Sequence, residues 1–134
     1  DLKQLKADYR AVYQGMMDLM NAEFEPGTTG FELDPIARRP LQAIGADYGH
    51  GTGHGIGLTL NVHEAPPNIS PRDMEGPKTP FAPGMIVSDE PGIYRPGKWG
   101  IRIENMLLCV EKPNGKYGFE CLTKCSIDDT LMKD

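Results

Sequence analysis

All three histidines of the chain lie in one short stretch, His50-Gly51-Thr52-Gly53-His54-Gly55-Ile56-Gly57-Leu58-Thr59-Leu60-Asn61-Val62-His63-Glu64. Glycines occupy alternate positions 51, 53, 55 and 57 of this stretch. Histidine is the commonest metal ligand and carries protons near neutral pH, and glycine lets a backbone approach a ligand closely. The stretch therefore predicts a binding or catalytic site. A glycine-rich turn whose histidines make only structural hydrogen bonds is the alternative.

The spacing of these residues excludes three known glycine- and histidine-rich motifs. A dinucleotide-binding loop needs G-x-G-x-x-G, but Ile56 and Leu60 stand where its third glycine would be. A Walker loop needs a lysine after its last glycine, and the stretch has none. A zincin helix needs His-Glu-x-x-His, but His63-Glu64 is followed by Ala65-Pro66-Pro67, which cannot continue a helix.

Two later segments add carboxylates. Ser88-Asp89-Glu90-Pro91-Gly92 follows a short apolar run, and Gly100-Ile101-Arg102-Ile103-Glu104-Asn105 leads into another. In an extended strand the side chains alternate between faces, so Arg102 and Glu104 share one face. If that face is covered, the charges need partners, and a metal ion with a neighbouring acid would supply them. An exposed polar face of an ordinary hairpin is the alternative.

The three motifs taken together, H-G-T-G-H-G-I-G…N-V-H-E, D-E-P-G-I-Y and G-I-R-I-E-N, resemble those of the metal-dependent aminopeptidases of the pita-bread superfamily, peptidase family M24. The run ending in Asn61-Val62-His63-Glu64 is most similar to the cytosolic type of the aminopeptidase P family, which removes the first residue of a peptide when proline is second. Methionine aminopeptidases and prolidases share the last two motifs more loosely. The resemblance covers nearly the whole chain, including Asp34-Pro35-Ile36-Ala37-Arg38, with the motifs in the correct order.

The resemblance implies a metal site made by His54, Glu90 and Glu104. Glu104 would bridge two divalent ions, and Glu90 would also carry the proton of the attacking water. We expect Mn²⁺, with Zn²⁺ and Co²⁺ as alternatives for such a mixed nitrogen and oxygen site. Two ions about 3.5–4 Å apart can activate water and stabilise the tetrahedral intermediate of peptide hydrolysis. We therefore expect the ligand atoms of these three residues within about 6 Å of one another.

Four further residues receive roles from the resemblance. His50 and His63 would rim the same cavity and contact substrate, stabilise the intermediate or shuttle protons. Arg102 and Tyr94 would orient the ligating carboxylates from behind them. The implied substrate is a peptide with proline in the second position. For the oligomeric state of the intact parent protein, the resemblance is compatible with a homodimer.

One departure concerns the number of ligands. The family uses five, of which two are aspartates upstream of the part matched here. No acidic pair before the motif has their strand context, since the candidates lie in or cap helices or directly precede the motif (Asp8, Asp18, Asp34 and Asp47). We therefore expect residues 1–134 to be the C-terminal portion of a single catalytic domain, part of a longer chain, and to be inactive and poor at holding divalent metal when alone.

Composition sets broader limits. The chain of 134 residues is 39% hydrophobic and 25% charged, as in globular domains, and its net charge of −5 argues against a nucleic acid or an anionic membrane as partner. It has no long apolar run. The three cysteines, Cys109, Cys121 and Cys125, are an odd number without the spacing of a disulfide framework or a four-ligand zinc site. We expect free thiols and a cytoplasmic location.

The elements that must position these residues follow from periodicity. Apolar residues at three- and four-residue spacing predict a helix from Asp1 to about Asn21, with its methionines in the core. A second helix is predicted with Asp34 as N-cap, Pro35 at its first helical position and Gly45 at its exit. On that helix, Arg38 and Arg39 are expected to be solvated or locally paired.

Strands are predicted for the remainder. Thr59–His63 should enter one, and the proline-rich Glu64–Gly84 should be a loop that rims the cleft or serves only as a connection. The other expected elements are a strand at Met85–Glu90, a turn at Pro91–Lys98, a long strand at Trp99–Lys112, a tight turn at Pro113–Lys116, a returning strand at Tyr117–Thr123, and a last helix starting near Ser126. The fold class is α+β: half of a pita-bread fold, with helices on one face of a curved, mostly antiparallel sheet.

Two other functions stay open from the sequence. The chain could belong to an Xaa-Pro dipeptidase, similar to prolidase, because the last two motifs are shared with that enzyme. It could also belong to a non-catalytic pita-bread binding module. The retention of His54, Glu90 and Glu104 favours an enzyme, because modules of that kind usually lose ligand residues.

Overall fold

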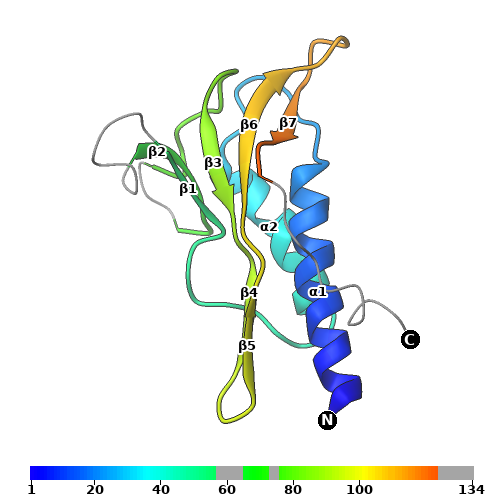
Figure 1. Ribbon diagram of the computed structural model, residues 1–134. Coiled ribbons are helices and arrows are strands. Elements are labelled where there is room, and N and C mark those ends of the chain that lie inside the picture. Colours follow the sequence, from blue (N-terminus) through cyan, green and yellow to red (C-terminus); the bar gives the residue numbers. More distant parts are fainter. Residues whose placement is uncertain (57–64, 73–75, 124–134) are drawn as a thin grey trace.

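Two helices cover one face of an antiparallel sheet, and this α+β arrangement confirms the predicted fold class (Figure 1). The computed structural model describes residues 1–56, 65–72 and 76–123. Helix α1 spans Leu2–Met20 and α2 spans Gly30–Gln42. Within this described part, no helix is long and apolar enough to cross a membrane. The predicted strand at Thr59–His63, the predicted last helix from Ser126 and Cys125 lie outside it.

Helix α1 forms as its periodicity predicts. Asp1 caps it by accepting a hydrogen bond from the backbone N–H of Lys3. Val12, Met16 and Leu19 are at most 1% exposed and face α2 and the sheet. Gly15 allows the two helices to pack closely, because a Cβ at this position would lie 2.2 Å from the carbonyl oxygen of Ala37.

Helix α2 begins earlier than predicted. Thr29, not Asp34, is its N-cap, and the side chain of Glu32 completes a capping box with it. This box satisfies two backbone N–H groups at once, which explains why the helix starts before the Asp34-Pro35 pair. Asp34 is instead a buried residue inside the helix. The exit is close to the prediction, since the helix ends at Gln42 and Gly45 follows with a φ of +75°.

Five strands form the main sheet, in the order β2-β1-β3-β6-β7, and every pairing is antiparallel. Their bounds are Gly53–Gly55 (β1), Ala65–Ile69 (β2), Ile86–Asp89 (β3), Asn105–Glu111 (β6) and Tyr117–Cys121 (β7). Strand β3 agrees with the predicted Met85–Glu90. The Asn114-Gly115 turn joins β6 to β7, with Gly115 at a φ of +85°. The buried Cys109 and the exposed Cys121 are free thiols, and burial raises the pKa of Cys109 to about 11.

Two segments differ from the sequence-based expectation. The predicted loop at Glu64–Gly84 contains β2, whose prolines are tolerated because β2 is the edge strand of the sheet. Half of the predicted turn at Pro91–Lys98 is a strand, β4 (Gly92–Arg95), which pairs with β5 (Trp99–Arg102) in a separate two-stranded sheet. The predicted long strand from Trp99 is therefore divided into β5 and β6.

Strands β3 and β4 run alongside β6 and β5 as one long ribbon, visible in Figure 1. The register is the same on both sides of the break, since Asp89 pairs with Asn105 and Gly92 pairs with Arg102. Between them, the backbone N–H of Ile103 donates to the carbonyl of Pro91 at 3.3 Å. Continuing this register through the break places Glu90 opposite Glu104.

Alternation along this ribbon decides which side chains reach the helices. Val87, Leu107 and Cys109 are fully buried in the core with residues of α1 and α2. The side-chain amide of Asn105 donates to the sulfur of Met16 in α1. Because successive side chains of a strand point to opposite faces, Glu90 and Glu104 are directed to the face away from the helices.

Candidate functional site

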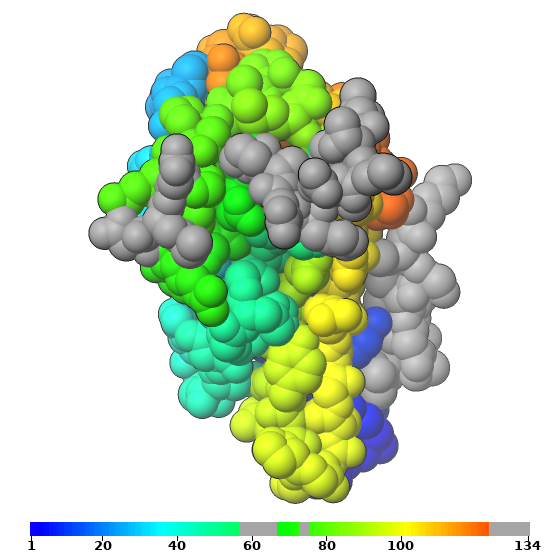
Figure 2. Space-filling view, turned by 90° about the vertical axis from the view of Figure 1, so that its left-hand side faces the viewer, coloured from blue at the N-terminus to red at the C-terminus, as the bar shows by residue number. Residues whose placement is uncertain are grey.

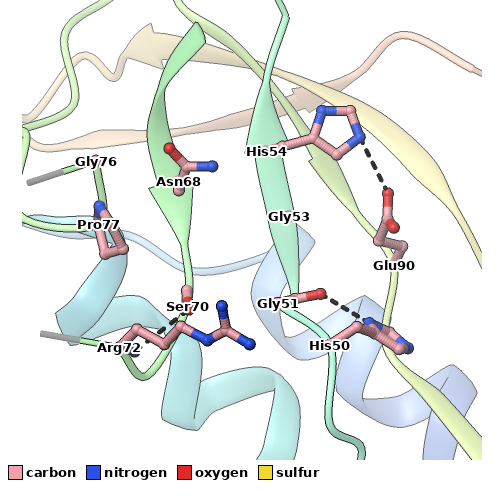
Figure 3. Close-up of a pocket in the computed structure, with 10 residues that line it drawn as sticks. All are labelled: His50, Gly51, Gly53, His54, Asn68, Ser70, Arg72, Gly76, Pro77 and Glu90. Carbon is pink, nitrogen blue, oxygen red and sulfur yellow. Dashed lines mark hydrogen bonds and ion pairs between the residues drawn. The ribbon is translucent and has the colours of Figure 1, made fainter. Parts of the chain in front are cut away.

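A cavity of about 570 Å³ lies beside β1 and β2 and brings together residues from four segments (Figure 3). One wall carries the histidine motif and the residue after β3. The other wall is formed by β2 and the residues after it, which face the first wall in Figure 3. The lining residues are His50, Gly51, Gly53, His54, Asn68, Ser70, Arg72, Gly76, Pro77 and Glu90.

His54 and Glu90 meet in this cavity. The Nε2 atom of His54 lies 3.5 Å from the Oε2 atom of Glu90, and their side chains are 25% and 15% exposed. Backbone hydrogen bonds fix both residues, since the N–H of His54 donates to the Ser88 hydroxyl and the N–H of Glu90 donates to the Thr52 carbonyl. Gly53 makes this close approach possible, because a Cβ there would lie 1.8 Å from the Ser88 carbonyl oxygen.

The chemistry of this pair fits a metal ligand set. The Nδ1 atom of His54 faces the carbonyl of Gly55 at 3.3 Å, and a carbonyl oxygen can only accept, so Nδ1 carries the proton. In the neutral tautomer the lone pair of Nε2 then faces the Glu90 carboxylate, and the 3.5 Å separation is longer than the usual 2.7–3.2 Å or so of an N–H···O bond. Oε2 of Glu90 is buried and has no hydrogen-bond partner in the described structure. Two electron-pair donors directed at one point are satisfied by a cation.

His50 contacts Tyr94 rather than the His54 and Glu90 pair. Its Nδ1 lies 2.8 Å from the carbonyl of Gly51, so Nδ1 carries the proton and Nε2 of the neutral ring accepts. The Tyr94 hydroxyl therefore donates to Nε2, at 2.7 Å. The His50 ring also lies against the ring of Tyr48, with 4.8 Å between the centroids. The hydrogen bond connects the histidine motif to β4.

A buried carboxylate lies behind the site. Asp89 is fully buried, and neither of its carboxylate oxygens has a hydrogen-bond partner among the described residues. Burial, with the negative charge of Glu90 as a smaller cause, raises the pKa of Asp89 well above its usual value. Both effects favour the protonated form, which limits the negative charge that accumulates beside Glu90.

An arginine of α2 holds the segment that leads into the histidine motif. Arg38 is 5% exposed and donates to the Asp34 carboxylate and to the backbone carbonyls of Tyr48 and His50. It also donates to the Asp47 carboxylate at 2.9 Å. Burial alone would lower the pKa of Arg38, but the hydrogen bond to Asp34 and the surrounding negative charge raise it overall. Arg38 is therefore charged and locally paired, in agreement with the sequence analysis.

The remaining predicted residues are not gathered into this cavity. Glu104 and Arg102 are exposed and are not among the residues that line the cavity. Ile103 between them is buried, as the alternation of side chains along a strand predicts. His63 lies outside the described residues. Within residues 1–56, 65–72 and 76–123, no group of three or more histidine, cysteine, aspartate or glutamate side chains is arranged to hold a metal ion. The close approach of Glu104 to His54 and Glu90 stays a prediction.

The segment at Glu64–Gly84 rims the cavity, as one of its two predicted roles required, but its strand and its lining side chains were not predicted. Asn68, Ser70 and Arg72 belong to β2 and to the residues that follow it, which were expected to be a loop. Their alternation with Pro67, Ile69 and Pro71 was the available signal of an extended segment. The prolines concealed this signal, because proline usually argues against a strand.

Comparison with known proteins identifies the family. The sequence profile of metallopeptidase family M24 matches residues 2–111. A probable Xaa-Pro aminopeptidase P of Phaeosphaeria nodorum is 50% identical over 114 residues, which are 84% of this chain and 17% of that protein. A second, from Laccaria bicolor, is 46% identical over 134 residues, with 95% of this chain and 21% of that protein covered. The chain thus spans about a fifth of the length of the curated relatives it matches.

Solved structures agree with this result. The X-prolyl aminopeptidase of Caenorhabditis elegans, described as a cytosolic enzyme with a di-nuclear active site, superposes with a TM-score of 0.88 and 34% identity, over 98% of this chain and 22% of that one. The Xaa-Pro dipeptidase of Bacillus anthracis superposes with a TM-score of 0.74 and 37% identity, over 93% and 32% of the two chains. With a profile match over most of its length and the predicted fold, the chain belongs to metallopeptidase family M24.

Proposed function

We propose that the full-length protein is a metal-dependent aminopeptidase that releases the first residue of peptides with proline in the second position. The observation that carries this proposal is the pair formed by His54 Nε2 and Glu90 Oε2, two electron-pair donors 3.5 Å apart in a cavity. The names of the relatives from Phaeosphaeria nodorum and Laccaria bicolor support the substrate class.

The residues of this chain would act together around two divalent ions. His54, Glu90 and Glu104 would hold the ions, and the register that sets Glu90 opposite Glu104 supports a bridging role for the second carboxylate. When bound, the ions would polarise the scissile carbonyl and activate the attacking water. Glu90 would accept the proton of that water and pass it to the leaving nitrogen of the substrate.

The histidines beside the metal site would stabilise charge on the substrate. His50 is oriented by its bonds to the Gly51 carbonyl and the Tyr94 hydroxyl, so its ring is fixed before substrate binds. Such preorganised groups stabilise the charge that develops in a transition state. His63 would act from the same motif, with Arg102 orienting the ligating carboxylates.

The metal is proposed to be manganese, with zinc and cobalt as alternatives. One imidazole nitrogen with carboxylate oxygens makes a site that first-row divalent ions occupy, and the oxygen-rich donor set favours Mn²⁺. We also propose that residues 1–134 alone hold the ions weakly and lack activity, because no three such ligands converge within the described residues. A cytosolic location is proposed from the description of the Caenorhabditis elegans enzyme, and a homodimer stays a proposal for the full-length protein.

An Xaa-Pro dipeptidase is the second candidate, favoured by the structural similarity to the Bacillus anthracis enzyme. The test measures metal-dependent hydrolysis of Xaa-Pro dipeptides and of longer peptides that begin with the same two residues. Faster hydrolysis of the longer peptides supports the aminopeptidase, and cleavage of the dipeptides alone supports the dipeptidase. Glu111→Gln serves as a surface control and Glu90→Gln as the inactive variant. If the manganese-loaded full-length protein hydrolyses neither class of peptide, both proposed functions are contradicted.

A further inference from the structure

The segment from Tyr48 to Thr52 carries His50 but has no regular secondary structure of its own before β1. In Figure 2 the teal atoms of this part of the chain lie between the green atoms around β2 and the yellow atoms of the β4–β5 hairpin. A segment of this kind has to be held by side chains, because it lacks the ladder hydrogen bonds of a strand.

Arg38 makes the required contacts. Its Nη1 donates to the Tyr48 carbonyl at 2.6 Å and its Nη2 donates to the His50 carbonyl at 2.8 Å. The guanidinium carbon also lies 3.9 Å from the centre of the Tyr48 ring, against which the His50 ring packs. One side chain of α2 thus fixes the backbone on both sides of residue 49 and the surface on which the imidazole of His50 rests.

A second route leads from Arg38 to Glu90. Nε of Arg38 donates to Oδ2 of Asp34, and the hydroxyl of Thr52 donates to Oδ1 of the same carboxylate, each at 2.6 Å. The carbonyl of Thr52 accepts the backbone N–H of Glu90 at 2.7 Å. Arg38, Asp34 and Thr52 are all at most 5% exposed. The network therefore joins α2, through buried side chains, to both His50 and Glu90 on the cavity wall that carries the histidine motif.

We propose that Arg38 is a positioning residue that sets the orientation and tautomer of His50, and through it the contact with Tyr94, in the peptidase site. This inference rests on the proposed function for its catalytic consequence, but the orientation of His50 can be measured without any activity. Lysine cannot replace Arg38, because an ammonium is a point donor on a flexible chain and cannot direct separate N–H groups to two carbonyls and two carboxylates.

The direct test records the imidazole nitrogens of His50 by NMR in the full-length protein labelled with ¹⁵N-histidine. The His50→Asn variant identifies the His50 signals by their loss. In the wild type, Nδ1 should be protonated and Nε2 should be the acceptor. Arg38→Lys should shift His50 to a mixture of tautomers. Arg39→Lys, the matched control in an exposed position of the same helix, should keep the wild-type signature.

Kinetics give the second readout. Arg38→Lys should lower kcat by about tenfold or more, which corresponds to about 1.4 kcal/mol in the barrier, with KM and metal content close to the wild type. In a His50→Gln background, the same substitution should change kcat by less than about twofold, because residues that act as one unit are not additive. Arg39→Lys should change none of these quantities.

Defined results would overturn the proposal. A folded Arg38→Lys variant that keeps the wild-type NMR signature of His50 would overturn it. An equal loss of kcat from Arg38→Lys in the wild-type and His50→Gln backgrounds would also overturn it. If Arg38→Lys does not fold, Asp47→Ala decides, because it removes the Asp47 acceptor of Nη1 at a half-exposed position. A partial shift of the His50 signature supports the proposal, and no shift overturns it. Absence of peptidase activity in the wild type would contradict the proposed function instead, and the NMR result would still test the position of His50.

Discussion

The Nε2 atom of His50 lies 2.7 Å from the hydroxyl oxygen of Tyr94, although the two residues are 44 positions apart in the chain. The bond connects the glycine- and histidine-rich motif to the β4–β5 hairpin. The hairpin is in turn held on α1, because Asp8 accepts hydrogen bonds from the side chains of Arg95 and Trp99. The orientation of one imidazole in the cavity therefore depends on both helices, through Arg38 on one side and through Tyr94 on the other.

Tyr94→Phe removes the donor of this bond and keeps the ring. We expect kcat/KM of the full-length protein on a proline-second peptide to fall about tenfold, with metal content unchanged, because one hydrogen bond contributes about 0.5–1.5 kcal/mol. Steady-state kinetics with metal analysis measure both. Tyr117→Phe, on β7, is the matched control and should be neutral. Loss of metal in Tyr94→Phe would show that the hydroxyl supports the ligands directly.

Glu104→Ala in the full-length protein should abolish activity together with bound metal, since it removes the proposed bridging ligand. His63→Ala should keep the metal but lower kcat/KM about a hundredfold or more, as expected for a group in proton transfer or oxyanion stabilisation. Elemental analysis beside kinetics separates the two, with exposed Glu120→Ala as control. A His63 variant without metal and a Glu104 variant that retains it would reverse the assigned roles.

Residues 1–134 alone should not bind Mn²⁺ tightly. His54, Glu90 and Glu104 are three of the five ligands that the resemblance implies, so an ion held by residues 1–134 would lack part of its coordination. Isothermal titration should detect no binding event tighter than about 1 μM, or about −8 kcal/mol, and a proline-second peptide should not be cleaved. Tight binding of two ions would show that the chain supplies further ligands from residues outside the described part.

The Asp8 contact should make stability depend on pH. Burial alone would raise the pKa of Asp8, but the hydrogen bonds from Arg95 and Trp99 and the nearby positive charge lower it overall. A lowered folded-state pKa stabilises the protein above the unfolded-state value of about 3.9, and this contribution is lost as pH falls through the folded-state value. Asp8→Asn should lower the free energy of unfolding by about 2 kcal/mol at pH 7, with the difference shrinking below pH 4. Asp18→Asn, on the same helix, should show no such trend in denaturant unfolding.

Gly15→Ala should destabilise the full-length protein, although alanine favours helix formation by about 1 kcal/mol over glycine. The new Cβ would lie 2.2 Å from the carbonyl oxygen of Ala37, so α1 and α2 would have to separate. Overpacking of this kind costs about 1–3 kcal/mol, which outweighs the gain in propensity. Thermal unfolding should show a lower Tm, while Gln14→Ala at the exposed neighbouring position should stay near the wild type. A higher Tm for Gly15→Ala would show that the helices can move apart freely.

Elements with a clear period were predictable from the sequence, and those governed by tertiary contacts were not. Helix α1 and strand β3 follow their apolar spacing. The start of α2 was misplaced because Asp34-Pro35 imitates a helix start, whereas Asp34 is buried inside the helix to receive Arg38 and Thr52. The sequence placed His54 and Glu90 in one site, and they meet in the cavity. It could not show that Arg38 reaches the His50 carbonyl, since such contacts depend on how a helix packs against a loop.

The constant register of the β3–β4 and β5–β6 ribbon limits how this part of the chain can change in length. Because side chains alternate, one residue inserted into or deleted from either arm would turn Glu90 or Glu104 towards the helices and bring Asp89 or Asn105 to the opposite face. Only paired changes in both arms, or changes in the tip at residues 96–98, would keep both carboxylates on the cavity side. We therefore expect the tip of this hairpin to vary in length among related proteins. The number of residues between each carboxylate and the tip should stay constant, or should change by the same amount in both arms.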